Sequence, residues 1–199
     1  MADSLAIIDG GGANIASLTF ALRRLGLEAE LTTNKSIIGN ADRVILPGVG
    51  AAADAMERLR NAQLLQFIKE LSQPVLGICL GMQLMFDASE EDGADCLGII
   101  SGKASKFSAA KNRPVPHMGW NRVMQKNDSP LFENIADGAH FYFVHSFALP
   151  LGDATIGTTE YGNAFTAVAE QNNFVAAQFH PERSGAAGAQ LLRNFINNY

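Results

Sequence analysis

Short apolar runs alternate with helix-like stretches through the first half of the chain. The apolar runs lie at residues 5–8, 27–33, 43–50 and 74–78, and the stretches at 14–26 and from residue 51 onward carry helical patterns. Short apolar runs bounded by turn residues are typical of buried strands. Strands that alternate with helices predict a parallel sheet with helices on both faces.

The first helical stretch has a clear apolar face. Ile15, Leu18, Leu22 and Leu25 lie three or four positions apart, so they share one side of a helix while the other side meets solvent. Gly26 follows directly, and glycine is the residue that most often ends a helix in the left-handed conformation. We therefore expect this helix to end at Gly26.

The pattern changes after about residue 95 to strand-like runs separated by turn residues. These runs lie at residues 121–125, 140–147, 154–161, 165–171 and 174–179. The last two read as a hairpin that turns at Asn172 and Asn173, because asparagine tolerates positive φ. Ser129 before Pro130 predicts a helix start, and a final helix is expected over about 185–197.

Together these patterns predict an α/β fold. We expect a mostly parallel central sheet flanked by helices, with an added antiparallel portion. The 199 residues are 47% hydrophobic, which is enough for a sizeable core, and no repeat, linker or low-complexity stretch divides them. We expect residues 1–199 to form one domain.

Composition and charge narrow the class of function. The net charge is −5 and the lysines and arginines are scattered, so no basic surface for nucleic acid or for an anionic membrane is indicated. No stretch approaches the ~20 apolar residues of a membrane span, and Asp9 interrupts the apolar start too early for a secretion signal. We expect a cytoplasmic protein in which Cys79 and Cys96 are free thiols.

Cys79 stands at a constrained position in the string VLGICLGMQLMF, residues 75–86. The string predicts an apolar strand, a sharp bend at the cysteine and then an amphipathic helix. Gly77 and Gly81 flank the cysteine with the spacing of a nucleophile elbow, where a side chain is presented at a strand-to-helix turn. A helix start favours the thiolate, which is the reactive form. The alternative is a small buried hydrophobic residue, as free cysteines often are.

A thiol nucleophile needs a base and a group that orients the base. His180 leaves the predicted strand 174–179, and the carboxyl ends of such strands are where active sites of open α/β sheets gather. Glu182 lies two residues on, beyond Pro181, within reach of the imidazole. Alone, this HPE string would indicate only a surface turn, but beside a cysteine elbow it completes a Cys79–His180–Glu182 triad.

A second glycine-rich turn follows the strand at residues 43–46. The string LPGVG places Gly48 and Val49 where a backbone N–H could face a developing oxyanion. A tight strand-to-helix turn explains the same string equally well. The string DGGGAN at 9–14 is not a dinucleotide motif, because Ile15 stands where the third glycine belongs.

The other aromatic and histidine residues first suggest structural roles. Trp120 ends the string HMGW and reads as core filler or as an interface anchor, with core filler favoured. His140 and His145 flank an aromatic strand, and histidines at strand ends are usually structural. No spacing of cysteines and histidines indicates a metal site, and we expect neither a metal nor another cofactor.

Five strings together resemble a known family. LPGVG, GICLGMQ, PHMGWN, FYFVHSF and HPERS occur in this order between residues 46 and 184. Jointly they are similar to class I (triad) glutamine amidotransferases, whose fold is flavodoxin-like, and in particular to the glutaminase subunits of imidazole glycerol phosphate synthases of histidine biosynthesis. GICLG with HPE indicates the class, and GMQ, PHMGWN and YFVHS narrow it to the histidine pathway.

The resemblance implies roles for individual residues. Cys79 would attack the carboxamide of glutamine, His180 would relay protons and Glu182 would orient His180, so that a thioester forms and is hydrolysed to glutamate. Ammonia is the leaving group. The resemblance also assigns the oxyanion to Gly48, Val49 and Leu80, and the bound glutamine to Gln83, Ser146 and Phe147.

The resemblance further implies a protein partner. In this family a (β/α)8-barrel cyclase subunit receives the ammonia and makes imidazole glycerol phosphate and AICAR in a heterodimer. The positions that meet the barrel correspond to Asn14, Met118, Trp120, Asn121 and Arg183, which moves the interpretation of Trp120 toward an interface. The chain departs from the family where a DYGMGN-like string is usual, since Ala13 replaces a glycine and the tyrosine is absent. Arg183 stands where lysine is more usual, and guanidinium is not an ammonium equivalent.

Other functions remain open on the sequence alone. The chain could serve as the glutaminase subunit of another synthase, such as the anthranilate or pyridoxal phosphate enzymes. It could also be a non-catalytic binding module on the same fold, although an intact triad argues against this. A thiol hydrolase for another substrate is disfavoured by the glutamine-holding positions.

Overall fold

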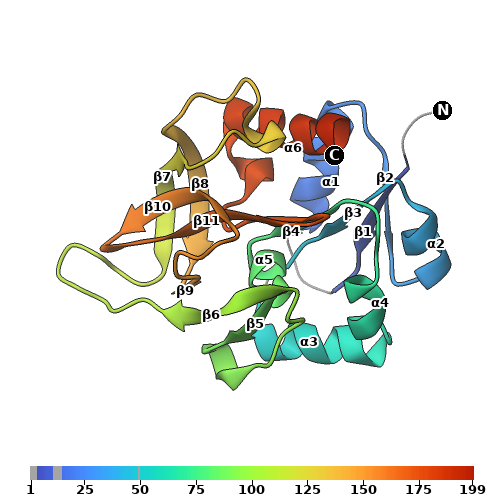
Figure 1. Cartoon of the computed structure of the whole chain (residues 1–199), viewed down its shortest axis with the longest axis horizontal. Coiled ribbons are helices and arrows are strands. Elements are labelled where there is room, and N and C mark those ends of the chain that lie inside the picture. The colour runs from blue at the N-terminus through green and yellow to red at the C-terminus, as the bar shows by residue number, and fades with distance from the viewer. Residues whose placement is uncertain (1–3, 11–14, 49) are drawn as a thin grey trace.

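A nine-stranded sheet forms the centre of the molecule (Figure 1). The computed structural model describes residues 4–10, 15–48 and 50–199. Parallel pairing joins β2 (Ala29–Thr32), β1 (Leu5–Ile8), β3 (Arg43–Leu46), β4 (Val75–Ile78) and β12 (Phe174–Ala177), in that order. Antiparallel pairing continues the sheet through β11 (Asn163–Gln171), β10 (Thr155–Tyr161), β7 (His117–Gln125) and β8 (Ala139–His145).

Helices and a small sheet surround this centre. The helices are α1 (Ile15–Arg24), α2 (Lys35–Asn40), α3 (Ala52–Asn61), α4 (Leu65–Lys69), α5 (Leu80–Met85) and α6 (Gly185–Asn198). Three 3₁₀ turns lie at η1 (Glu91–Gly93), η2 (Pro130–Phe132) and η3 (Pro181–Arg183). The small sheet has the order β5-β6-β9, with β5 at Phe86–Ser89, β6 at Ile100–Lys106 and β9 at Phe147–Ala148.

The parallel strands divide the hydrophobic core into two layers. In β1, Leu5 and Ile7 join the core beneath α1 and α6, whereas Ala6 and Ile8 join the core beneath α3, α4 and α5. Strand side chains alternate between the faces of a sheet, so a strand of four apolar residues contributes to both layers. Figure 1 shows α1 and α6 on one side of the sheet and α3 and α4 on the other.

The fold predicted from the sequence is confirmed. The order of the parallel strands, 2-1-3-4 and then β12 as the fifth, is the flavodoxin-like order of doubly wound folds. The hairpin between β11 and β12 turns at the expected asparagines, with Asn172 at φ 55°. The first helix also ends as expected, because Gly26 takes the left-handed φ of 79° that favours glycine.

Two local expectations are wrong. The helix after Cys79 is not amphipathic, since all of its residues from Leu80 to Met85 are buried. It lies between the sheet, α3 and β5, and so has no solvent-facing side. The helix predicted at Ser129 is only the 3₁₀ turn η2, although the Ser129 side chain does accept a hydrogen bond from the Leu131 N–H as a cap.

Among the described residues, no helix combines the length and the apolar character needed to cross a bilayer.

Candidate active site

The backbone turns sharply at Cys79, between β4 and α5. Cys79 has φ 54° and ψ −109°, a conformation that costs a residue with a Cβ on the order of 1–3 kcal/mol. Its N–H donates to the Ala177 carbonyl at 2.8 Å, which continues the pairing of β4 with β12 up to the bend. The strand-to-helix elbow predicted from the sequence is therefore present.

Glycines make this bend possible because the segments around it approach very closely. A Cβ on Gly48 would lie 2.7 Å from the Gly81 nitrogen, and a Cβ on Gly81 would overlap the Leu46 carbonyl oxygen. A Cβ on Gly77 would lie 2.9 Å from the Met85 sulfur. The end of β3, the end of β4 and the start of α5 can meet only if these positions carry no side chain.

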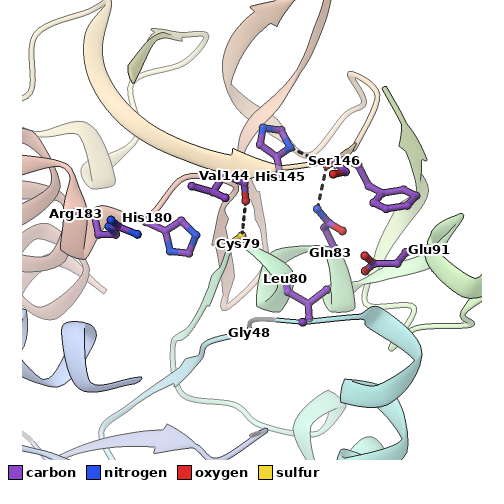
Figure 2. A pocket seen from close by; sticks show the side chains of 12 residues that line it. Gly48, Cys79, Leu80, Gln83, Glu91, Val144, His145, Ser146, His180 and Arg183 are labelled. Atoms are coloured by element: carbon purple, nitrogen blue, oxygen red, sulfur yellow. Dashed lines mark hydrogen bonds between the residues drawn. The ribbon is translucent and has the colours of Figure 1, made fainter. Parts of the chain in front are cut away.

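His180 and Glu182 form a buried pair next to this bend. The His180 Nδ1 lies 2.9 Å from the Glu182 Oε1, with both side chains almost fully buried. Figure 2 shows the His180 ring beside the Cys79 sulfur. Burial opposes protonation of His180, but hydrogen bonds and electrostatic attraction to Cys79 and Glu182 raise its pKa from 6.5 to about 10. The imidazole is thus held as a cation between a sulfur and a carboxylate.

Strand β8 crosses the carboxyl ends of β4 and β12 and holds the His180 turn. The His180 N–H donates to the Tyr142 carbonyl at 2.9 Å. The buried Ser184 hydroxyl accepts from the Tyr142 N–H at 2.9 Å and donates to the His180 carbonyl at 2.6 Å. The Val144 carbonyl oxygen lies 3.7 Å from the Cys79 sulfur. Strand β8 therefore fixes both the base and the nucleophile.

A cleft of about 320 Å³ opens above Cys79. Its lining includes most of the residues predicted to act there: Gly48, Cys79, Leu80, Gln83, Ser146, Phe147, His180 and Arg183. Glu182 lies behind His180 and does not line the cleft. Val49 and Asn14, assigned from the sequence to the oxyanion and to the partner, lie outside the described residues.

Gln83 forms part of the cleft wall and is held rigidly. Its Nε2 donates to the Phe147 carbonyl at 3.1 Å and to the Gln178 Oε1 at 3.0 Å. The Gln178 Nε2 in turn lies 3.9 Å from the Cys79 sulfur. With both of its N–H donors bonded, the Gln83 amide has one orientation available.

The cleft contains a carboxylate that the sequence analysis missed. Glu91 lines it, and its Oε2 accepts a hydrogen bond from the Ala52 N–H at 2.9 Å. Burial raises the pKa of this carboxyl above 4.5. Glu91 belongs to the acidic string SEEDGAD, which has no recognisable motif, so no signal in the sequence separated it from solvated charges.

The strand β7 presents three large apolar side chains to solvent, Met118, Trp120 and Met124. Met118 is 62% exposed and Trp120 is 56% exposed. The interpretation of Trp120 as core filler is wrong, because β7 alternates and its even-numbered positions face outward. Trp120 packs edge-on against Tyr142, and the Arg183 guanidinium lies 4.8 Å from the Tyr142 ring. The rim of the cleft thus continues into an aromatic surface formed by Met118, Trp120 and Tyr142.

Both cysteines are free thiols, as predicted. Cys96 lies away from the cleft lining, and burial raises the pKa of its thiol to about 11. It is therefore protonated and poorly nucleophilic at neutral pH.

Comparison with known proteins places this geometry in a family. The family described as "Glutamine amidotransferase class-I" matches residues 6–198. The chain is 51% identical to "Imidazole glycerol phosphate synthase subunit HisH" of Pasteurella multocida, with 98% of each chain covered. It is 50% identical to the protein of the same name from Photorhabdus laumondii, with 96% of this chain and 97% of that one covered. It is 46% identical to subunit HisH 1 of Vibrio vulnificus, with 96% of each covered.

Solved structures with little sequence similarity share the fold. A Thermoplasma acidophilum protein described as part of a GMP synthase superposes with a TM-score of 0.73 at 20% identity, covering 98% of this chain and 92% of that chain. A glutamine amidotransferase superposes with a TM-score of 0.73 at 19% identity, covering 96% of each. At this level of identity the likeness concerns the architecture alone.

Substituting Gly81→Ala should destabilise the protein, because the new methyl group would overlap the Leu46 carbonyl. Overpacking of this kind costs about 1–3 kcal/mol, which for a chain of this size lowers the Tm by several degrees. Thermal unfolding measures the loss. Gly152→Ala is the matched control, since nothing lies within 4 Å of a Cβ there. Equal Tm values for the two variants would contradict the close approach at the elbow.

Substituting Glu182→Gln should lower the pKa of His180 from about 10 toward 6.5, because the amide no longer attracts the imidazolium. A raised pKa stabilises the folded state fully below about pH 6.5, and this contribution disappears as the pH rises through about 10. The variant should therefore lose stability at pH 7 and approach the wild type above pH 10. Histidine NMR titration and unfolding measured across pH test both points, with Glu57→Gln on the exposed face of α3 as control. An unchanged His180 titration in Glu182→Gln would refute the pairing.

Proposed function

The chain belongs to the class-I glutamine amidotransferase family and, within it, to the family of imidazole glycerol phosphate synthase subunits HisH. From this membership we propose that the chain hydrolyses glutamine as the HisH subunit of such a synthase. The observation that carries the proposal is the placement of Cys79 and His180 at one cleft, with Glu182 bonded to His180 behind it, in a chain that matches these relatives over nearly their full length. We place the reaction in the cytoplasm, where thiols stay reduced.

The thioester forms in two steps. The Cys79 sulfur attacks the side-chain carbonyl carbon of glutamine, and the electron pair of the C=O bond moves to the oxygen. When the oxyanion collapses, the C–N bond breaks and the Nε2–H of His180 protonates the leaving nitrogen, which departs as ammonia. Because Glu182 accepts from Nδ1, the Nε2 of His180 is the nitrogen directed to the reacting atoms.

Hydrolysis of the thioester regenerates the enzyme. A water molecule loses its proton to the neutral His180 Nε2 and attacks the thioester carbon. The tetrahedral intermediate then expels the Cys79 thiolate, and glutamate is released. His180 ends as the imidazolium, which the Glu182 carboxylate stabilises, as it was before the reaction.

The oxyanion is assigned to backbone donors near the elbow. The Leu80 N–H is the first of α5, and the first N–H groups of a helix have no partner within it. The Gly48–Val49 peptide supplies the second donor. Removing one such donor costs about 10²–10³ in rate. If this peptide faces the oxyanion only in the complex, the isolated subunit hydrolyses glutamine slowly and little glutamine is wasted.

The cleft offers complementary groups for an amino acid. The Glu91 carboxylate is suited to the α-ammonium group of glutamine, which would stabilise the charged form that burial opposes. Gln83 and the backbone of Ser146 and Phe147 line the same wall and are assigned to the rest of the ligand. One anionic and several neutral polar groups favour a zwitterionic, amide-bearing substrate.

A (β/α)8-barrel cyclase subunit is proposed to dock on the aromatic surface beside the cleft. This surface consists of Met118, Trp120 and Tyr142, with Arg183 at its edge and Asn121 behind it. Exposed Trp, Met and Arg side chains are the types enriched at protein interfaces. Docking there would close the cleft rim at Arg183, so ammonia released at Cys79 would leave toward the partner, which uses it to make imidazole glycerol phosphate and AICAR.

Substituting Cys79→Ser should reduce glutamine hydrolysis by at least about 10³-fold, because a hydroxyl does not ionise beside His180 as a thiol does. Glutamate release is measured with and without the histidine-pathway barrel subunit. Cys96→Ser is the matched control and should retain activity. Glutamine-dependent turnover that appears with another synthase barrel instead would contradict the partner, and failure of a glutamine-analogue electrophile to label Cys79 in the complex would contradict catalysis.

Substituting Trp120→Ala should weaken binding of the barrel subunit by at least about 30-fold, since a central tryptophan of an interface is commonly worth 2 kcal/mol or more. Calorimetric titration of the two subunits measures the change. Leu31→Ala is the control, because Leu31 is an exposed apolar residue on β2, the edge strand at the other end of the sheet. Unchanged affinity for Trp120→Ala would place the interface elsewhere.

A further inference from the structure

Two buried histidines that the proposed mechanism does not use face each other across β7 and β8. His117 and His145 are directly paired in the register of these strands. The His117 Nδ1 lies 2.9 Å from the His145 Nε2, and the residues are only 4% and 6% exposed. A buried pair of imidazoles is costly unless its hydrogen bonds are satisfied, so each ring nitrogen needs a donor or acceptor partner.

Neighbouring groups fix the tautomer of each ring. The His145 Nδ1 lies 2.7 Å from the Phe147 carbonyl, which can only accept, so this nitrogen carries the hydrogen. The neutral His145 then has a lone pair on Nε2, which accepts from the His117 Nδ1–H. Burial lowers the pKa of His117 to about 4 and that of His145 to about 3, so both rings are neutral at physiological pH.

The row of hydrogen bonds extends beyond His117 to Asn121, on the strand β7 that also carries Met118 and Trp120. The His117 Nε2 lies 3.3 Å from the Asn121 Nδ2 and accepts from it. The Asn121 amide has one orientation, because its Nδ2 also donates to the Glu160 carbonyl and its Oδ1 accepts from the Arg122 N–H. The hydrogen bonds therefore run one way, from Asn121 through His117 and His145 to the Phe147 carbonyl.

Aromatic rings hold both imidazoles in place. His117 is stacked against Tyr161, with the ring centres 4.1 Å apart, and against Phe143 at 5.0 Å. His145 lies edge-on to Phe107 and tilted against Phe165, with the ring centres 5.2 Å apart in each pair. Packing on this scale leaves the rings little freedom to turn, so the chain of hydrogen bonds is rigid.

The chain of hydrogen bonds ends in the cleft. The Phe147 carbonyl accepts from the His145 Nδ1 and also from the Gln83 Nε2, and Figure 2 shows the two bonds meeting there. Gln83 also bonds to Gln178, whose amide reaches the Cys79 sulfur. A displacement of the Phe147 carbonyl would therefore move the Gln83 amide in the cleft wall.

We propose that His117 and His145 are positioning residues, which hold the Phe147 carbonyl and with it the Gln83 amide in the geometry that binds the amino-acid substrate. The proposal rests on the proposed function, since that substrate is glutamine. It also makes the binding wall depend on β7, whose other face presents Met118 and Trp120 to the partner. The acting group is the Nδ1–H of His145, and His117 keeps that hydrogen in place by occupying Nε2.

Two substitutions of His145 separate positioning from packing. His145→Phe keeps an aromatic ring and loses the donor, whereas His145→Asn keeps a donor at the position of Nδ1 and loses the ring. We expect His145→Phe in the complex with the barrel to raise the KM for glutamine at least fivefold with a smaller change in kcat, and His145→Asn to remain within about twofold of the wild type. Thermal unfolding should show the opposite order, with the asparagine variant the less stable. His140→Gln, an exposed histidine on the same strand, is the control.

A second measurement does not depend on activity or on the folding of variants. Nitrogen NMR of the wild-type protein should show both buried imidazoles neutral with the hydrogen on Nδ1. Hydrogen on Nε2 of His145, a wild-type KM in His145→Phe, or a KM in His145→Asn as high as in His145→Phe would each overturn the proposal. If instead the wild-type complex fails to hydrolyse glutamine while the NMR result holds, the proposed function fails and the tautomer assignment stands.

Discussion

The bend at Cys79 is the constraint on which the rest of the site depends. Cys79 has a Cβ and yet takes a positive φ there, which costs conformational free energy. The packing of β3, β4 and α5 around the turn compensates for that cost. They can converge only because Gly48 and Gly81 carry no side chain. The same approach places the turn after β3 beside the nucleophile and starts α5 next to the sulfur. The close approach of β3, β4 and α5 therefore determines three things: the position of the nucleophile, the backbone donors near it and the strained φ of Cys79.

The site also depends on the antiparallel half of the sheet. The parallel strands β4 and β12 end at Cys79 and near His180, but they provide no wall opposite these residues. Strand β8 provides it, through the carbonyls of Tyr142 and Val144 and through the residues that follow. Because β8 pairs with β7 along its whole length, the strand that walls the cleft lies directly beside the strand that carries Met118 and Trp120. A partner that contacts β7 is thus only one strand away from the wall of the cleft.

The sequence predicted those parts of the structure that local pattern determines. The short apolar runs became β1, β3 and β4 because a buried strand needs only apolar residues, and the elbow was recognisable because a bend of this kind needs glycines at a set spacing. The position of Glu91 in the cleft could not be predicted, because its burial depends on how η1 packs against α3. Helix α5 was predicted as amphipathic from the local pattern alone, whereas contacts with the sheet, α3 and β5 bury every one of its residues. The His117–His145 contact depends on strand register, which no local pattern gives.

The energetics of the buried histidine pair favour a geometric role over a stabilising one. A hydrogen bond between buried neutral groups contributes only about 1 kcal/mol net, whereas an unsatisfied partner costs about 1–3 kcal/mol. Replacing both partners by apolar groups of the same shape can be nearly neutral, so apolar side chains packed against Phe143 and Phe165 would stabilise the fold about as well. What such a core could not supply is a donor directed at the Phe147 carbonyl, which already binds Gln83. Orientation at the cleft wall is therefore the property that the two imidazoles add.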